Sequence, residues 1–78
     1  MINILRVERA RHNITMEELA IKVGVTRQTI HAIETNKNSP SLLIATRISW
    51  LFGKRIDEIF RMEEEEKTSW ESWERLDF

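Results

Sequence analysis

Residues 15–35 of this 78-residue chain read TMEELAIKVGVTRQTIHAIET, and this stretch decides the fold. Its first half predicts a helix that begins after Thr15, because the side chains of Thr15 and Glu18 are spaced to form a capping box. Ile14 before the cap completes a hydrophobic staple with the fourth helical residue. Apolar residues at helical spacing then give the helix an inward face, and they are Leu19, Ala20 and Val23.

A second helix is expected after a tight turn. Gly24 is the expected left-handed end of the preceding helix, since a Cβ is penalised in that conformation. Thr26 is the expected cap of the next helix, and Asn36 is its expected stop. Between them Ile30 and Ile33 define the inward stripe. The pattern therefore predicts two short helices joined by a turn.

Apolar spacing outside this stretch predicts three more helices, so the body is expected to be all-α with five helices. The first covers about residues 3–12. The fourth has Pro40 at its first position and ends at Gly53, and a short fifth helix covers about residues 56–60. The side chains expected to pack the fourth helix are Leu43, Ile44, Ile48, Leu51 and Phe52. No strand-like alternation of useful length is present in the body.

Charge divides the chain into two parts. Residues 1–61 hold ten basic and six acidic residues, a balance of +4, whereas residues 62–78 hold two basic and seven acidic residues, a balance of −5. We therefore expect a basic domain over residues 1–61, with a helix-turn-helix motif at about residues 16–35, and an acidic, Trp-containing C-terminal extension over residues 62–78. The net charge of −1 does not exclude a nucleic-acid partner, because phosphate attraction depends on local charge.

Composition removes several classes of function. The chain has no cysteine, so disulfides and thiolate metal sites are excluded. It has no glycine-rich phosphate loop and no histidine pair at metal spacing, so no enzyme, cofactor or metal site is predicted. The acidic run at residues 63–66 is interpreted as solvated surface. No stretch is long and apolar enough to span a membrane and no signal peptide is visible, so a cytoplasmic protein is expected.

The third predicted helix has the layout of a helix that reads DNA. With Ile30 and Ile33 on its back, helical spacing turns Gln28, His31, Ala32 and Thr35 outward and places Arg27 at the edge. An α-helix fits the major groove of B-DNA, where Gln pairs with adenine, Arg with guanine, and a small apolar side chain contacts the thymine methyl. These residue types predict a double-stranded DNA partner.

The spacing of four residues is similar to that of the Cro/cI-type repressors, also called the XRE family of helix-turn-helix regulators. That family carries a small residue, then Gly four positions later, an aliphatic residue after six more and Glu after four more, here Ala20, Gly24, Ile30 and Glu34. The segments VTRQTIHAIE and SPSLLIATRISWLFG are also similar to its third and fourth helices. The resemblance covers residues 3–60 and implies a Cro/cI-like (lambda-repressor-like) five-helix domain.

The resemblance also implies roles for individual residues. Base contacts are implied for Arg27, Gln28, His31 and Ala32. Contacts with the DNA backbone are implied for Thr15, Met16, Thr26, Thr29, Asn36, Lys37 and Asn38. Structural roles are implied for Gly24 and for a pair between Arg9 and Glu34. The family usually carries Gln where this chain has Met16, whose thioether cannot donate the hydrogen bonds that Gln gives to a phosphate, and this departure bears on affinity or register.

Trp50 lies, by helical spacing, on the side of the fourth helix opposite Ile48. An exposed aromatic indicates an interface, either with Trp70 or Trp73 of the same chain or with a second copy. Dimer contacts in the resembling family often use the fifth helix and the residues after it, here Ile56, Ile59, Phe60 and Met62. The extension is expected to add either a helix or a small dimer strand near residues 59–62.

These observations predict a sequence-specific, double-stranded DNA-binding transcriptional regulator. The expected form is a homodimeric repressor whose third helix, at about residues 26–36, enters the major groove of a near-palindromic operator. An alternative is an antitoxin of the same fold, whose acidic C-terminal tail with Trp70 and Trp73 binds a protein partner. A third interpretation, suggested by Met16, is a helical module that has lost DNA binding.

Overall fold

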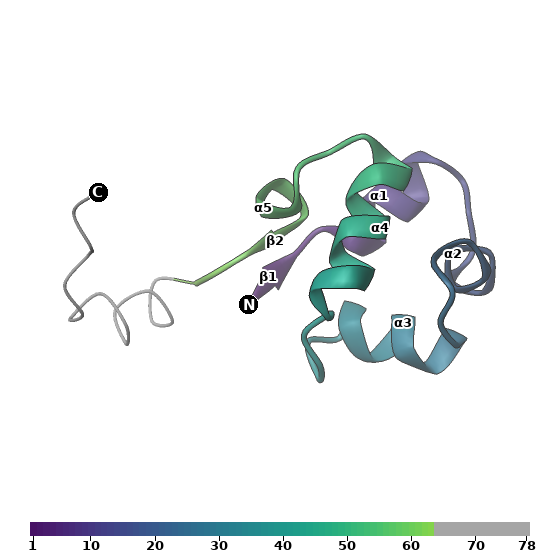
Figure 1. The fold of residues 1–78 in the computed structure, drawn as a ribbon, viewed down its shortest axis with the longest axis horizontal. Coiled ribbons are helices and arrows are strands. Elements are labelled where there is room, and N and C mark those ends of the chain that lie inside the picture. Colours follow the sequence, from purple (N-terminus) through teal and green to yellow (C-terminus); the bar gives the residue numbers. More distant parts are fainter. Residues whose placement is uncertain (64–78) are drawn as a thin grey trace, which may run out of the picture.

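The computed structural model describes residues 1–63. The elements in chain order are β1 (Ile2–Asn3), α1 (Leu5–Arg11), α2 (Met16–Val23), α3 (Arg27–Glu34), α4 (Leu42–Phe52), α5 (Ile56–Ile59) and β2 (Phe60–Arg61). In Figure 1, α2 and α3 lie at one end of the domain, α5 and the two strands lie at the other, and α4 runs between them. The five predicted helices are therefore present, and none of those described is long and apolar enough to cross a membrane.

A single apolar core holds these elements together. The buried apolar side chains come from five helices and β2, and they are Leu5, Leu19, Ala20, Val23, Ile30, Ile33, Ala45, Ile48, Phe52, Ile59 and Phe60. The inward faces predicted for residues 15–35 are confirmed, because every residue assigned to them belongs to this core. Burial of this shared core fixes how α3 sits on the domain.

The predicted ends of the two motif helices are also confirmed. The Thr15 hydroxyl accepts a hydrogen bond from the Glu18 backbone N–H at 3.1 Å, and the Thr15 N–H donates to the Glu18 carboxylate at 3.0 Å. Gly24 ends α2 in the left-handed region, with φ of +79°. The Thr26 hydroxyl caps α3 by accepting from the Thr29 N–H at 3.1 Å. The turn chemistry written in the sequence therefore sets both helix boundaries.

The N-terminus differs from the prediction. The first helix was expected from residue 3, but α1 begins at Leu5, and residues 2–3 form β1 instead. β1 pairs with β2 in antiparallel register, Ile2 opposite Arg61 and Asn3 opposite Phe60. Two-residue strands show no alternation pattern, so the strand at residues 2–3 could not be predicted locally. It forms because it pairs with residues that are distant in the sequence.

Helix α4 begins later than expected and packs through a different face. Pro40 was predicted at its first position, but Ser41 is the cap, accepting a hydrogen bond from the Ile44 N–H at 3.2 Å. Leu43 and Leu51 were predicted to pack the helix, yet they are 58% and 38% exposed. The core side is formed by Ala45, Ile48 and Phe52, and Gly53 ends the helix as expected.

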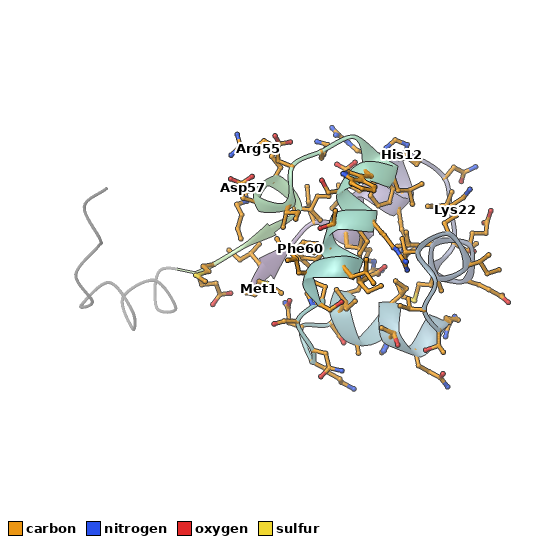
Figure 2. All side chains as sticks on the ribbon, viewed as in Figure 1. Met1, His12, Lys22, Arg55, Asp57 and Phe60 are labelled. Atoms are coloured by element: carbon orange, nitrogen blue, oxygen red, sulfur yellow. The ribbon has the colours of Figure 1, made fainter. Side chains whose placement is uncertain are left out.

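The segment after α5 completes the small sheet. α5 ends at Ile59 rather than at Phe60, which already belongs to β2. The strand predicted here does form, and within the single chain it pairs with the N-terminal residues. Figure 2 shows Phe60, in β2, near Met1. Trp70 and Trp73 lie outside the described residues.

Candidate nucleic-acid interface

The outer face of α3 carries polar side chains on an apolar back. Ile30 and Ile33 are buried, at 0% and 1% exposure, and they fix the rotation of the helix about its axis. Arg27, Gln28 and His31 are consequently exposed, while Ala32 is half-buried. The side chains predicted to read bases therefore lie on the solvent side of one helix. Whether they contact bases stays a prediction.

The N-termini of α2 and α3 belong to this surface as well. Thr15 and Thr26 occupy the two cap positions, and Thr29 places its hydroxyl 3.0 Å from that of Thr26. The first backbone N–H groups of a helix and the positive end of its dipole favour phosphate. Helix α2 has acidic residues in its first turn, whereas α3 has none. The start of α3 is thus the more suitable of the two for an anion.

Glu18 occupies the first turn of α2 as part of the capping box. Hydrogen bonds from the backbone and side chain of Thr15 lower the pKa of this carboxyl from its ordinary value, because they favour its charged form. The charge also complements the positive end of the α2 dipole. Glu18 therefore serves the helix boundary rather than the DNA-facing surface.

Met16 is the first residue of α2 and lies next to residues of α3. Its side chain is half-buried and packs against the core. It lines a depression shared with Arg27 on one side and another shared with His31 on the other. The thioether therefore fills an apolar role at the place where the resembling family uses Gln, and the backbone contact predicted for this residue can come only from its N–H.

The predicted pair between Arg9 and Glu34 is present. Arg9 donates from Nε to Glu34 Oε2 at 2.6 Å and from Nη2 to Oε1 at 3.1 Å. Arg9 also donates to the Ile14 carbonyl at 3.1 Å, and the contact with Glu34 raises the pKa of its guanidinium. The Glu34 side chain is only 3% exposed. The one acidic residue of α3 is therefore neutralised and kept away from the surface that would face DNA.

The loop after α3 is held by backbone contacts that leave its side chains exposed. Asn36 adopts a left-handed conformation with φ of +60° and ends the helix region as predicted. The N–H groups of Lys37 and Asn38 both donate to the Ala32 carbonyl, at 2.9 and 3.2 Å. Lys37 and Asn38 therefore extend into solvent beside the C-terminal end of α3, where the sequence predicted phosphate contacts.

Two polar residues that no sequence pattern singled out support the motif. Asn3 donates from Nδ2 to the Ile33 carbonyl at 3.0 Å and to Asn36 Oδ1 at 2.8 Å, which ties β1 to the end of α3. Arg47 of α4 donates to the Val23 carbonyl at 3.0 Å, which closes the C-terminal end of α2. The acceptors lie more than twenty residues away in the sequence, so no local pattern signals either contact.

A buried carboxylate lies on the other side of α1. Glu8 is 1% exposed. It follows the buried Leu5 by three residues, and this helical spacing was the sign in the sequence that its side chain would be buried. Its carboxylate lies 3.3 Å from Lys54 Nζ, 3.5 Å from Arg11 Nη1 and 3.6 Å from His12 Nε2. The His12 ring packs on Phe52 with centroids 5.0 Å apart. These contacts join α1 to the end of α4 and give His12 a structural place.

The residues predicted to form a dimer or tail interface separate into two groups. Ile59 and Phe60 are buried in the core of the chain, and Ile56 is half-buried against it. Trp50 is 79% exposed on α4, and Met62 is 49% exposed after β2. The first group stabilises the single chain, whereas the second is exposed to solvent. The dimer itself stays a prediction.

Comparison with known proteins finds the same motif. A family model described as helix-turn-helix matches residues 5–59. An uncharacterized HTH-type transcriptional regulator of Methanocaldococcus jannaschii is 52% identical over 66 residues, which cover 85% of this chain and 100% of that protein. A regulator of the same description from Archaeoglobus fulgidus is 45% identical over 62 residues, covering 80% of this chain and 89% of the relative. In Bacillus subtilis a similar protein is 43% identical over 65 residues, covering 83% and 98%.

Proposed function

This chain belongs to the XRE family of helix-turn-helix DNA-binding transcriptional regulators, which are not enzymes, and we propose that it acts in the cytoplasm as a dimeric repressor. Each protomer inserts α3 into the major groove of one half of a near-palindromic operator. The half-sites lie about one helical turn apart, roughly 34 Å centre to centre. The bound dimer blocks access of RNA polymerase to the promoter.

The observation that carries this proposal is the charge and exposure of α3. Arg27 and Gln28 are exposed at its N-terminal end, and the only acid of the helix, Glu34, is held by Arg9. A helix that approaches DNA must present donors without a repelling carboxylate. The arrangement therefore supports insertion of the N-terminal half of α3, with its axis held by contacts to α1.

The proposed division of labour follows the side-chain chemistry. Gln28 pairs with the N6 and N7 atoms of an adenine, and Arg27 pairs with the O6 and N7 atoms of a guanine. His31 and Ala32, one turn further along, contact the next bases, with Ala32 against a thymine methyl. The backbone set positions the helix without reading sequence, and it comprises Thr15, Met16 through its N–H, Thr26, Thr29, Asn36, Lys37 and Asn38.

We assign the dimer contact to the side of the domain that carries the small sheet. Ile2 and Met62 are 47% and 49% exposed there, beside the half-buried Ile56. Asn3 links β1 to the Ile33 carbonyl at the end of α3, so a contact at the sheet would also fix the orientation of both reading helices. Exposed apolar residues at a sheet edge favour association with a second copy.

The proposal is tested by duplex selection followed by salt titration. A preferred site is first selected from random double-stranded DNA, and the purified full chain is then titrated onto that site and onto a scrambled duplex. We expect affinity that falls with salt, two chains per selected site, and symmetric protection of two half-sites. Salt-independent binding, or no affinity for any duplex, would contradict the proposal.

Two variants separate reading from positioning. Gln28→Ala should reduce discrimination between the selected and scrambled duplexes by about tenfold, since a bidentate base contact contributes about 1–3 kcal/mol. Lys37→Gln should weaken both duplexes equally and reduce the slope of log affinity against log salt by about 1. Arg55→Gln is the matched control, because Arg55 pairs with Asp57 on α5, away from α3 in Figure 2.

A further inference from the structure

The outer face of α4 exposes apolar side chains that no described contact explains. Ala45, Ile48 and Phe52 turn one side of the helix into the core. Leu43 and Trp50, seven residues apart, project from the opposite side, since residues two turns apart share a helix face. Trp50 is 79% exposed, Leu42 78% and Leu43 58%. We name this surface the α4 outer face and define it by Leu42, Leu43, Arg47 and Trp50.

The α4 outer face is basic as well as apolar. α4 contains no acidic residue, and its one charged residue, Arg47, lies between Leu43 and Trp50 on the helix surface. Its guanidinium donates through Nη1 to the Val23 carbonyl at the C-terminal end of α2, and the residue as a whole is exposed. An apolar face of this size on a small domain marks a binding surface, and here the preferred partner is acidic as well as apolar.

We propose that the α4 outer face is the docking site for residues 68–78 of the same chain. This segment, TSWESWERLDF, lies outside the described residues and outside the family match, which ends at residue 59. Trp70, Trp73 and Leu76 recur at every third position, and Glu71, Glu74 and Asp77 follow each of them. The aromatic side chains meet Trp50 and Leu43, and the carboxylates face Arg47.

The starting point and the length of the segment permit this docking. Phe60, the first residue of β2, belongs to the same core cluster as Ala45, Ile48 and Phe52, so β2 begins beside the core on which α4 packs. Residues 64–70 can extend over roughly 24 Å, at about 3.4 Å per residue. Helix α4 has 11 residues, about 16 Å of axis. The linking residues are therefore longer, when extended, than the axis of α4.

The opposite charges of the body (residues 1–61) and the extension (residues 62–78) favour docking of the extension on the α4 outer face of its own chain. The extension carries −5 and the body +4, and an extension joined to the body stays at high effective concentration near it. A second copy would bring the same segment, but only at a cost in association entropy. The proposal does not depend on DNA binding, so the two can fail separately.

Tryptophan fluorescence of the full chain tests the proposal, because the chain has three tryptophans and the described residues hold only Trp50. In Trp70→Phe/Trp73→Phe, Trp50 is the sole tryptophan and the segment keeps its aromatic character. In Trp70→Ser/Trp73→Ser, Trp50 is again the sole tryptophan, but the segment loses the aromatic character of positions 70 and 73. Quenching is measured with acrylamide, which is neutral and insensitive to the acidic residues. Circular dichroism verifies equal helix content.

We expect Trp50 in the Ser pair to be quenched about twofold more strongly than in the Phe pair, with emission shifted to the red. Leu43→Ser in the Phe background should produce a similar rise in the quenching of Trp50, because it removes an apolar side chain from the α4 outer face. Equal quenching in both pairs would overturn the proposal. Protection of Trp50 that disappears on dilution, together with a dimer seen by sedimentation, would overturn docking within one chain and assign the face to a second copy.

Discussion

Arg9 and Glu34 are joined at two points, Nε to Oε2 at 2.6 Å and Nη2 to Oε1 at 3.1 Å, across 25 residues of sequence. The pair attaches the last turn of α3 to α1. Because Arg9 also donates to the Ile14 carbonyl, the start of α2 is held by the same guanidinium. The orientation of the helix that we propose reads DNA thus depends on one side chain of α1.

Arg9→Met should lower the free energy of unfolding by about 3 kcal/mol, since it leaves the Glu34 carboxylate, 3% exposed, without its partner. Urea denaturation measures this change. Arg55→Met is the matched control, because the Arg55–Asp57 pair is 75% and 66% exposed and should contribute less than about 1 kcal/mol. Equal effects of the two substitutions would show that the Arg9 pair is not needed for stability.

Gly24→Ala should be more destabilising than Gly53→Ala, although both glycines end a helix at positive φ. A Cβ at Gly24 would lie 3.0 Å from Arg47 Nη1, whereas a Cβ at Gly53 would meet nothing within 4 Å. We expect losses of about 2 and about 1 kcal/mol respectively, because only backbone strain acts at Gly53. Thermal or urea unfolding of the two variants tests the order, and the reverse order would contradict the role given to Arg47.

The capping box should make stability depend on pH through Glu18. Thr15 lowers the pKa of Glu18 in the folded chain, so its ionised form stabilises the fold above the ordinary carboxyl pKa. This contribution disappears as the pH falls through the lowered value. The wild type should therefore have a higher urea midpoint than Glu18→Gln at about pH 7, and the two should converge as the pH falls well below the ordinary carboxyl pKa. A difference that persists unchanged at low pH would assign it to another cause.

Met16→Gln should lower the stability of the domain and raise its affinity for DNA. The half-buried thioether packs against the core, so a polar amide there should cost about 1 kcal/mol of unfolding free energy. The same amide can donate to a phosphate, which should raise affinity for the selected duplex by about tenfold. Ile21→Gln is the control, since Ile21 is 74% exposed on α2 and should change neither quantity. Unchanged affinity of Met16→Gln would show that position 16 does not approach the DNA backbone.

Local chemistry allowed the motif to be predicted from the sequence. Helix ends are set by hydrogen bonds and backbone conformations that involve only a few consecutive residues. The helix ends predicted from Thr15 with Glu18, from Gly24 and from Thr26 are therefore the ones observed. The resemblance to the family also implied the contact between Arg9 and Glu34, which is present. The choice of exposed residues on α3 followed from the positions of Ile30 and Ile33, because a 3.6-residue period leaves one outward side.

Contacts between distant segments account for the features that sequence patterns did not predict. The strand at residues 2–3 exists because residues 60–61 lie beside it. Leu43 was expected to pack but is exposed, because the remaining helices cover the other side of α4, whereas the exposure of Trp50 followed from its spacing from Ile48. The sequence by itself determined the motif and its polar front, since capping and helical period are local. Tertiary packing decided that Leu43 stays exposed on α4, how the termini pair and how Asn3 anchors the end of α3, because those depend on neighbours that are remote along the chain.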